Sequence, residues 1–224
     1  IDADVLLHEL GWSGQFKDKE TKEEVLLPFE KLSEMLDEKI RIISLEAWAD
    51  EEPTLFLTSS EELVAMWNRL AKYTDAEPIE HVKNFRYDVA KSRPYKGTRH
   101  NPKPFHFYNL MAQMLTNYEV VVSNDGLEAD DMICIAHTEA RRRGDQTIVC
   151  SRDKDLRIVR GHHYSWECGK QAAIGPVTFE DPLGYLVQKD SGEVYGYGLA
   201  FFMYQLLAGD TADNIPGLPG CEEI

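Results

Sequence analysis

Four groups of carboxylates recur along this chain of 224 residues, in a pattern that could bind metal. They are Asp2 and Asp4 in IDADVLL; Glu128, Asp130 and Asp131 in LEADDM; Asp153 and Asp155 in SRDKDL; and Asp210 and Asp213 in GDTADNIPG. Like charges repel, so a folded protein gathers so many acids only where cations neutralise them. Oxygen-rich clusters suit Mg²⁺ or Mn²⁺, and two such ions on one phosphodiester are typical of nucleases and polymerases.

The elements that must position these acids follow from the apolar pattern. Apolar runs predict strands over 1–7, 54–60, 119–125 and 146–153, with shorter strands at 163–168 and 176–179. Helical spacing and capping residues predict helices over 28–43, 60–74, 104–115, 127–144 and 197–208. This alternation predicts an α/β fold with a central, mostly parallel sheet flanked by helices. The acids would then meet beyond the carboxyl ends of the strands, where such folds place active sites.

The LEADDM group lies at a predicted junction between a strand and a helix. In an ideal helix Glu128 and Asp131 share a face, whereas Asp130 points roughly 200° away from Glu128. The three acids can converge only if Glu128 precedes the first helical turn. The alternative is ordinary acidic decoration of a helix N-terminus, which the helix dipole favours.

The GDTADNIPGLPG segment is the most specific of the motifs. One helical turn would separate Asp210 from Asp213, so both could face one ion. The prolines and glycines that follow, with Gly217 and Gly220 among them, predict a tight hairpin whose free N–H groups can receive a phosphate. In SRDKDL, two carboxylates two residues apart could bridge metal ions, and a polar loop with a helix cap is the alternative.

Positive charge is concentrated in one part of an acidic chain. Between Lys83 and Lys103 there are seven Lys or Arg and one acid, a net charge of +6, whereas the whole chain carries −15 and the remainder −21. Candidate phosphate contacts are Arg86, Lys91, Arg93, Lys96 and Arg99, and Tyr95 is a candidate platform for base stacking. A solvated loop is the alternative reading of this basic segment.

Composition excludes several other classes of protein. At 43% hydrophobic residues the chain can bury a core, and no apolar run approaches the roughly 20 residues that span a bilayer. The four cysteines have no C-x-x-C spacing, which predicts free thiols in a reducing, cytoplasmic or otherwise intracellular compartment. Because the chain opens on Ile1 inside a predicted strand, we expect upstream residues to be missing.

Taken in order, these motifs resemble those of the 5′ nuclease superfamily, which comprises flap endonucleases, phage 5′–3′ exonucleases and the 5′ nuclease domain of bacterial DNA polymerase I. The matching positions are Asp2; Phe85 and Arg86; Tyr95, Lys96 and Arg99; Gly126, Glu128, Asp130 and Asp131; Ser151, Asp153, Asp155 and Leu156; and Gly209, Asp210, Asp213, Asn214 and Gly217. The match spans essentially the whole chain.

The resemblance implies a PIN-like α/β nuclease domain over 1–208, with an arch-like basic segment at 83–103. It also implies the start of a helix–hairpin–helix module over 209–224, truncated here, where K⁺ is a further candidate ligand. Two Mg²⁺ or Mn²⁺ ions are expected: one on Glu128, Asp130 and Asp153 with Asp2 nearby, and one on Asp155, Asp210 and Asp213. Asp131 is a further metal-binding candidate. Lys96 and Arg99 would steady the scissile phosphate. The implied substrate is DNA with 5′ ends, flaps, nicks or branches, and RNA in hybrids is a further candidate; we expect a monomer and no membrane partner.

The chain departs from the family pattern at the second strand. That strand usually ends in an Asp, but TLFLTSS carries Thr58, Ser59 and Ser60 there. A catalytically weak DNA-binding module on the same scaffold therefore stays open as an alternative function. A PIN-type ribonuclease is a third, which would share the acid cluster but not the GDTADNIPG hairpin.

Overall fold

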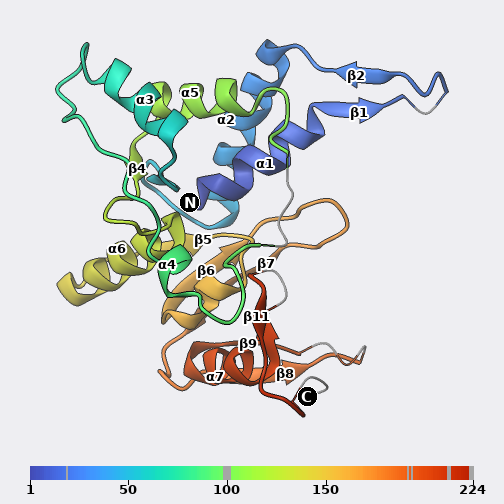
Figure 1. The fold of residues 1–224 in the computed structure, drawn as a ribbon, viewed down its shortest axis with the longest axis vertical. Coiled ribbons are helices and arrows are strands. Elements are labelled where there is room, and N and C mark those ends of the chain that lie inside the picture. The colour runs from blue at the N-terminus through green and yellow to red at the C-terminus, as the bar shows by residue number, and fades with distance from the viewer. Residues whose placement is uncertain (19, 98–101, 191, 193, 211–212, 222–224) are drawn as a thin grey trace.

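Helices and short strands alternate along most of the chain in a mixed α/β fold (Figure 1). The structure is a computed structural model, and it describes residues 1–224 except 19, 98–101, 191, 193, 211–212 and 222–224. The helices are α1 (Ala3–Ser13), α2 (Phe29–Glu46), α3 (Glu61–Leu70), α4 (Arg86–Val89), α5 (Phe107–Asn117), α6 (Ala129–Arg143) and α7 (Gly198–Ala208), with a 3₁₀ turn η1 (Asp155–Ile158). None of the helices described is long and apolar enough to cross a membrane.

The strands are short and form several small ladders. They are β1 (Gln15–Lys17), β2 (Glu24–Leu26), β3 (Leu55–Leu57), β4 (Val120–Val122), β5 (Ile148–Cys150), β6 (Gly161–Ser165), β7 (Ile174–Phe179), β8 (Tyr185–Gln188), β9 (Val194–Tyr197), β10 (Gly209–Asp210) and β11 (Ile215–Pro216). The pairs β3–β4 and β5–β6 are parallel, whereas β1–β2, β6–β7, β8–β9 and β10–β11 are antiparallel. The prediction of a single central, mostly parallel sheet is therefore not confirmed, although the mixed α/β class is.

The first two residues connect the two parallel ladders. Ile1 donates its terminal amine to the carbonyl of Thr54 (2.7 Å) and accepts from the N–H of Phe56 (2.9 Å). On the other side, the N–H of Asp2 donates to the carbonyl of Cys150 (3.0 Å). Residues 1–2 therefore lie between the β3–β4 pair and the β5–β6–β7 ladder, and Asp2 stands at the point where both meet.

The predicted strand over 1–7 is wrong beyond Asp2. The chain turns directly into α1, because the Asp2 carboxylate accepts from the N–H of Val5 (3.4 Å) and caps the helix. Three consecutive apolar residues, Val5 to Leu7, fit one buried helix face as well as a strand, so the pattern could not decide between them. The β1–β2 and β8–β9 hairpins were not predicted either. Strands β1, β2 and β8 are largely exposed, whereas Gly196 and Tyr197 of β9 are buried.

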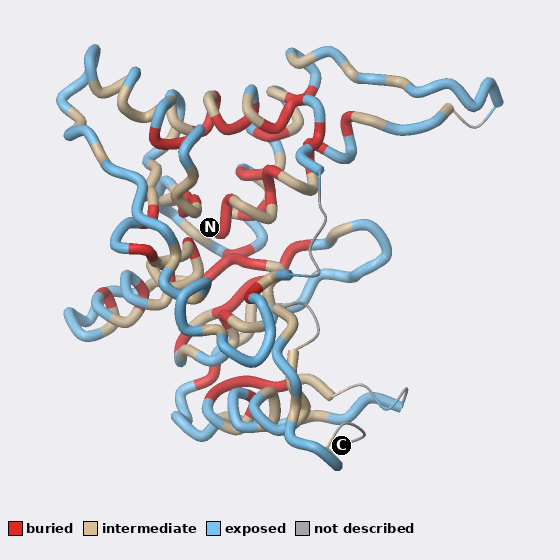
Figure 2. Tube along the Cα trace, in the orientation of Figure 1, coloured by how far each residue is buried: buried red, intermediate tan, exposed pale blue. Residues whose placement is uncertain are grey.

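Helices cover both faces of the central strands. Strand residues alternate in direction, so Leu55 and Leu57 of β3 enter the core shared with α1, α2 and α5, whereas Phe56 faces Ala129 and Ile133 of α6. Figure 2 shows this buried band running through the helical layer and the strands, while the β1–β2 ribbon and the outer loops stay exposed. The layers hold the strand ends, and the acids that follow them, at one edge.

A second, smaller lobe carries the end of the chain. Helix α7 packs on η1, β8 and β9, and the β10–β11 hairpin follows it at the bottom of Figure 1. In this hairpin Gly209 pairs with Pro216, and the φ of Gly209 is +81°, with Gly217 so close that a Cβ would lie 2.3 Å from its nitrogen. The tight hairpin was predicted within 215–220, whereas the observed hairpin joins β10 to β11, and a separate turn at 219–220 follows this hairpin. Within the described residues up to Cys221, no second helix follows it, so the helix–hairpin–helix module is not confirmed.

The packing of α1 in the hydrophobic core can be tested by its effect on stability. Leu7 of α1 is fully buried, whereas Leu45 near the end of α2 is 57% exposed. We expect Leu7→Ala to lower the free energy of unfolding by about 2–5 kcal/mol, because a buried leucine leaves a cavity behind. Leu45→Ala should change it by less than about 0.5 kcal/mol. Urea titrations of both variants measure the difference, and equal losses would contradict the assignment of α1 to the core.

Candidate active site

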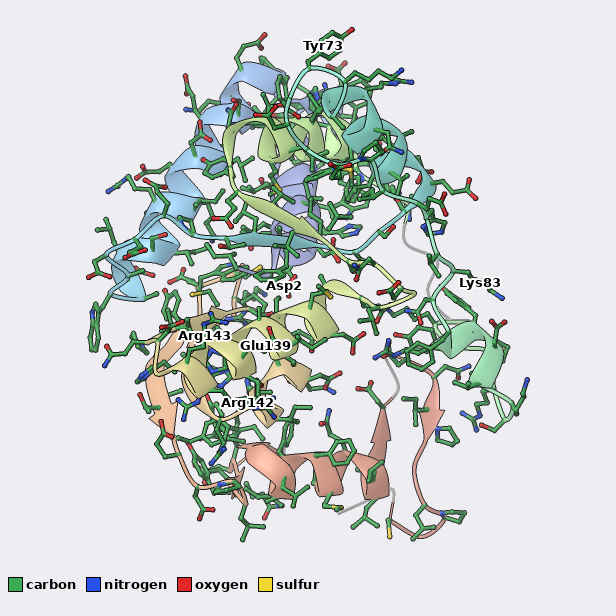
Figure 3. All side chains as sticks on the ribbon, turned by 90° about the vertical axis from the view of Figure 1, so that its left-hand side faces the viewer. Asp2, Tyr73, Lys83, Glu139, Arg142 and Arg143 are labelled. Atoms are coloured by element: carbon green, nitrogen blue, oxygen red, sulfur yellow. The ribbon has the colours of Figure 1, made fainter. Side chains whose placement is uncertain are left out.

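Asp2 is a buried carboxylate at the centre of the molecule. It is 2% exposed and lies between the α1–α2–α5 layer and α6 (Figure 3). The hydroxyl of Ser151, directly after β5, donates to its Oδ2 (2.6 Å). Burial, and repulsion from Asp4, raise the pKa of Asp2 to about 7 despite this hydrogen bond. The same Ser151 hydroxyl accepts from the N–H of Asp153 (2.8 Å), so one serine orients two acids.

Asp130 and Asp153 face Asp2 from two other segments. Asp130 lies in the first turn of α6 and Asp153 follows β5. Burial raises the pKa of both, and for Asp130 the neighbouring charges of Asp2 and Asp153 add to it and bring its pKa to about 9. No hydrogen-bond donor among the described residues contacts the Asp130 carboxylate. A buried carboxylate without a hydrogen-bond donor is stabilised by binding either a proton or a cation.

Glu128 contacts the basic segment. It precedes the first turn of α6, which begins at Ala129 and not at residue 127 as predicted, and it occupies the capping position. Its Oε1 accepts from Nζ of Lys96 (2.6 Å) and its Oε2 from the hydroxyl of Tyr95 (2.8 Å). Tyr95 is 8% exposed and packs edge-on against Tyr87, so its ring is not the open stacking platform that the sequence suggested. Its hydroxyl instead positions Glu128.

Asp4 joins the same group from α1. Both its carboxylate oxygens lie within 3.2 Å of the N–H of Thr58, at the end of β3. Burial raises the pKa of Asp4, while Lys96 acts against this rise and Glu128 adds to it. The Thr58 hydroxyl accepts from the N–H of Ala129 (2.9 Å), which ties β3 to the start of α6.

These acids line one cleft of about 930 Å³. Its acidic residues are Asp2, Asp4, Glu9, Glu128, Asp130 and Asp153, and its lysines are Lys96 and Lys103. Six acids from the starts of α1 and α6, from within α1 and from the segment after β5 line the cleft with two lysines. Their carboxylate oxygens are the donor type that hard divalent cations prefer. Across the described part of the chain no three His, Cys, Asp or Glu side chains stand in metal-ligand geometry. The carboxylates share the cleft without converging, as mutual repulsion requires.

Asp131, a metal-ligand candidate from the sequence, does not line this cleft. Arg86 donates to both its oxygens (2.9 and 2.8 Å), and the N–H of Glu128 donates to Oδ2 (3.0 Å). Burial acts to raise the pKa of Asp131, but these hydrogen bonds outweigh it and lower the pKa. The helical spacing turns Asp131 away from Asp130, so it anchors Arg86 and caps α6 instead.

The second predicted acid group is held by a lysine. Nζ of Lys154 donates to Asp155 (3.0 Å) and to Asp210 (2.6 Å), and the Gln205 amide of α7 also donates to Asp155. Asp210 lies in β10 and Asp213 in the turn before β11, so the expected helical spacing between them is wrong. The carbonyl of Asp213 accepts from the N–H of Lys96 (3.4 Å), and the Asn214 amide donates to the carbonyl of Pro94 (3.1 Å). The hairpin thereby contacts the basic segment.

The basic segment is partly neutralised by the protein itself. Arg86 pairs with Asp131, Lys96 with Glu128 and Lys83 with Asp88. By contrast, Lys91 and Arg93 are exposed and have no ion-pair partner among the described residues. The position predicted for Arg99 lies outside the described residues.

Gly126, at φ +73°, allows the β4–α6 loop to approach the basic segment, because a Cβ there would lie 2.7 Å from the Lys83 carbonyl.

Two site residues escaped the sequence analysis. Lys154 lies between two acids in SRDKDL, a spacing that could have marked it as an internal counter-ion. Asp4 was noted as an acid but received no role, because a strand was expected where α1 begins. Thr58 and Ser151 carry no charge pattern that would single them out.

The sequence is similar to a 5′-3′ exonuclease and to DNA polymerase I of other organisms. A 5′-3′ exonuclease of Buchnera aphidicola subsp. Schizaphis graminum is 27% identical over 142 residues, which cover 61% of this chain and 45% of the relative. DNA polymerase I of Rhizobium leguminosarum is 28% identical over 100 residues, 44% of this chain and 9% of the polymerase. The chain thus spans less than half the length of these curated relatives. No protein-family model matches the sequence.

Among solved structures, two of the flap endonuclease of bacteriophage T5 are similar, one crystallised with metal ions and one with DNA and metal ions. Each is 15% identical, and each alignment covers 95% of this chain and 67% of the other, with TM-scores of 0.45 and 0.44 respectively. The exonuclease and polymerase relatives therefore confirm the resemblance of this chain to the 5′ nuclease superfamily, which the order of its motifs predicts.

Proposed function

We propose that this chain is a divalent-metal-dependent 5′ nuclease that hydrolyses phosphodiester bonds of DNA. One observation carries the proposal: Asp2, Asp4, Glu128, Asp130 and Asp153, from separate segments, line one cleft beside Lys96. The exonuclease relative supports the reaction class, and the DNA-processing relatives support an intracellular location. Exonuclease and flap endonuclease action, and DNA and RNA–DNA hybrids, are the alternatives that an assay with end-labelled substrates separates.

In this proposal the acids of the cleft hold the cation. Asp130 and Asp153, with Asp2 oriented by Ser151, are the ligand candidates, and Glu128 completes the set. A bound Mg²⁺ or Mn²⁺ would lower the pKa of water and neutralise charge on the phosphate. Lys96 is placed to exchange its contact with Glu128 for a phosphate oxygen, and so to stabilise the charge that develops during cleavage.

A second ion on Asp155, Asp210 and Asp213 remains part of the proposal. Two of these acids now share the ammonium of Lys154, so a cation there has to displace that lysine or bind beside it. A catalytically weak DNA-binding module is the second candidate function, because Lys154 already neutralises two acids and β3 ends without one. We retain 1–208 as the proposed nuclease domain and 209–224 as the proposed start of a DNA-binding region.

The ligand assignment predicts loss of activity without loss of fold. We expect Asp130→Asn and Asp153→Asn each to lower the rate of DNA cleavage by about 100-fold or more, because even indirect partners of a metal site cost about 10- to 100-fold. Both variants should keep the far-ultraviolet circular dichroism of the wild type. The matched control is Glu139→Gln, an exposed acid further along α6 (Figure 3), which should cleave normally. Near-normal cleavage by both site variants would contradict the assignment.

The buried acids predict a pH dependence of stability. Since the pKa values of Asp2 and Asp130 are raised to about 7 and about 9, the folded protein keeps protons that the unfolded chain releases above about pH 4. The metal-free protein should therefore lose stability between about pH 5 and about pH 9, as these acids ionise. Mg²⁺ should raise the melting temperature more at the alkaline end, because it binds the deprotonated acids.

Thermal melts with EDTA and with Mg²⁺ across this range measure the effect. In Asp130→Asn the alkaline loss should be smaller, since one ionisation is removed. A metal-free protein that gains stability from pH 5 to pH 9 would argue against carboxylates held together in the cleft.

Lys91 and Arg93, which are exposed and have no ion-pair partner among the described residues, are the residues that we expect to contact phosphate groups of DNA. We expect Lys91→Ala and Arg93→Ala each to reduce the slope of log Kobs against log salt by about one, because each removes one phosphate contact. Arg142→Ala, an exposed cation on the far side of α6 from Lys83 (Figure 3), should leave the slope unchanged. Titrations of labelled DNA at several salt concentrations provide the measurement. Equal slopes for all three variants would place the DNA elsewhere.

A further inference from the structure

Helix α7 has an uncovered apolar side, and it lies at the end of the molecule away from α2, α3 and α5 (Figure 1). Its inner side packs on η1, β8 and β9, where Phe201 is buried and the amide of Gln205 donates to Asp155. The outer side consists of five residues at helical spacing, each between 40% and 54% exposed: Leu199, Phe202, Met203, Leu206 and Leu207. A helix that is apolar all round is normally buried all round, whereas α7 is buried on one side.

Two further exposed leucines lie beside the ends of α7. The carbonyl of Leu183 accepts from the N–H of Ala200 (2.7 Å) in the first turn, and the N–H of Leu218 donates to the carbonyl of Leu207 (2.8 Å) in the last turn. We call the five outer residues of α7 and these two leucines the α7 face. A large apolar side chain presents about 200 Å² when fully exposed, so the α7 face leaves roughly 700 Å² uncovered.

The size and composition of the α7 face fit a protein interface. The largest apolar patch of a typical monomer is about 300–600 Å², whereas a standard interface buries about 800 Å² of each partner. Two such faces in contact would bury about 1,400 Å² in total, which lies within the range of stable complexes. The face contains a phenylalanine and a methionine, and α7 has no charged residue. Aromatic residues and Met are enriched at the centres of interfaces, from which charged residues are depleted.

We propose that the α7 face is a self-association surface, through which two copies of this chain form a dimer about a two-fold axis. A second copy offers the same uncharged area, so no charged group of α7 loses its hydration in the contact. Because the chain carries a net charge of −15, two copies that met through an acidic surface would repel each other. A nucleic acid or an anionic membrane would attract a surface that carries Lys or Arg, and α7 has neither.

The proposal replaces the monomer that we expected from the sequence, and it does not depend on the proposed nuclease function. Sedimentation velocity of the whole chain from about 1 μM to about 100 μM tests it, because interfaces of standard size bind with micromolar or tighter affinity. We expect the monomer to convert to a dimer over this range. Amide hydrogen exchange at the two ends of the range locates the contact: residues 199–207 should exchange more slowly in the dimer, whereas β1 and β2 should not change.

One substitution removes the proposed contact without touching the core. Leu206→Glu places a carboxylate in the middle of the α7 face, on an exposed side chain, so the fold should persist. We expect the association constant of the dimer to fall about 100-fold or more, because like charges would meet across the interface. Leu45→Glu is the matched control, since it adds the same charge at an exposed leucine of α2, and Leu206→Met keeps the face apolar. Both should dimerise like the wild type, and circular dichroism verifies that each variant folds.

Several outcomes would overturn the proposal. A wild type that stays monomeric at about 100 μM, or that forms only polydisperse aggregates, would exclude a second copy as the partner of the α7 face. A folded Leu206→Glu variant that dimerises like the wild type would place the contact elsewhere, and so would equal losses in Leu206→Glu and Leu45→Glu. Because none of these measurements involves DNA or metal, their failure would leave the proposed nuclease function standing.

Discussion

The placement of residues 1–2 between two parallel ladders is the constraint on which the active edge depends. Backbone hydrogen bonds of Ile1 and Asp2 reach β3 on one side and β5 on the other. The Asp2 carboxylate then caps α1 and accepts from Ser151. Because one residue ends an extended segment and begins a helix, its side chain cannot leave the edge of the strands. Asp153, which follows β5, and Asp130, at the start of α6, line the same cleft as Asp2.

Electrostatic repulsion governs how those acids are arranged. The protein neutralises part of the charge with its own cations: Lys96 on Glu128, Arg86 on Asp131, and Lys154 on Asp155 and Asp210. The acids without such a partner are the ones whose pKa burial raises most clearly, Asp2 and Asp130. The internal counter-ions thus separate the acids that the protein itself neutralises from Asp2 and Asp130, which pair with no cation among the described residues.

The same ion pairs bring the basic segment to the acidic edge. A surface ion pair contributes little stability, but these pairs are partly buried and link distant parts of the chain. Arg86 and Lys96 contact the start of α6, while Pro94 and Lys96 contact the β10–β11 hairpin through backbone groups. A segment that composition describes only as basic therefore has a defined position. Acid and base lie together where a phosphodiester would need both.

Local sequence determined the elements that depend on neighbouring residues. Ser60 caps α3 and Gly144 closes α6 in the left-handed conformation, and both residue types favour these positions because caps are short-range interactions. The acid groups and their order along the chain were also readable, and with them the resemblance to the 5′ nuclease superfamily. Only the tertiary structure decided that Asp131 pairs with Arg86 and that Asp4 lies against the end of β3. Both outcomes rest on partners 45 or more residues away, Arg86 for Asp131 and Thr58 for Asp4, and a sequence pattern carries no distance between such residues.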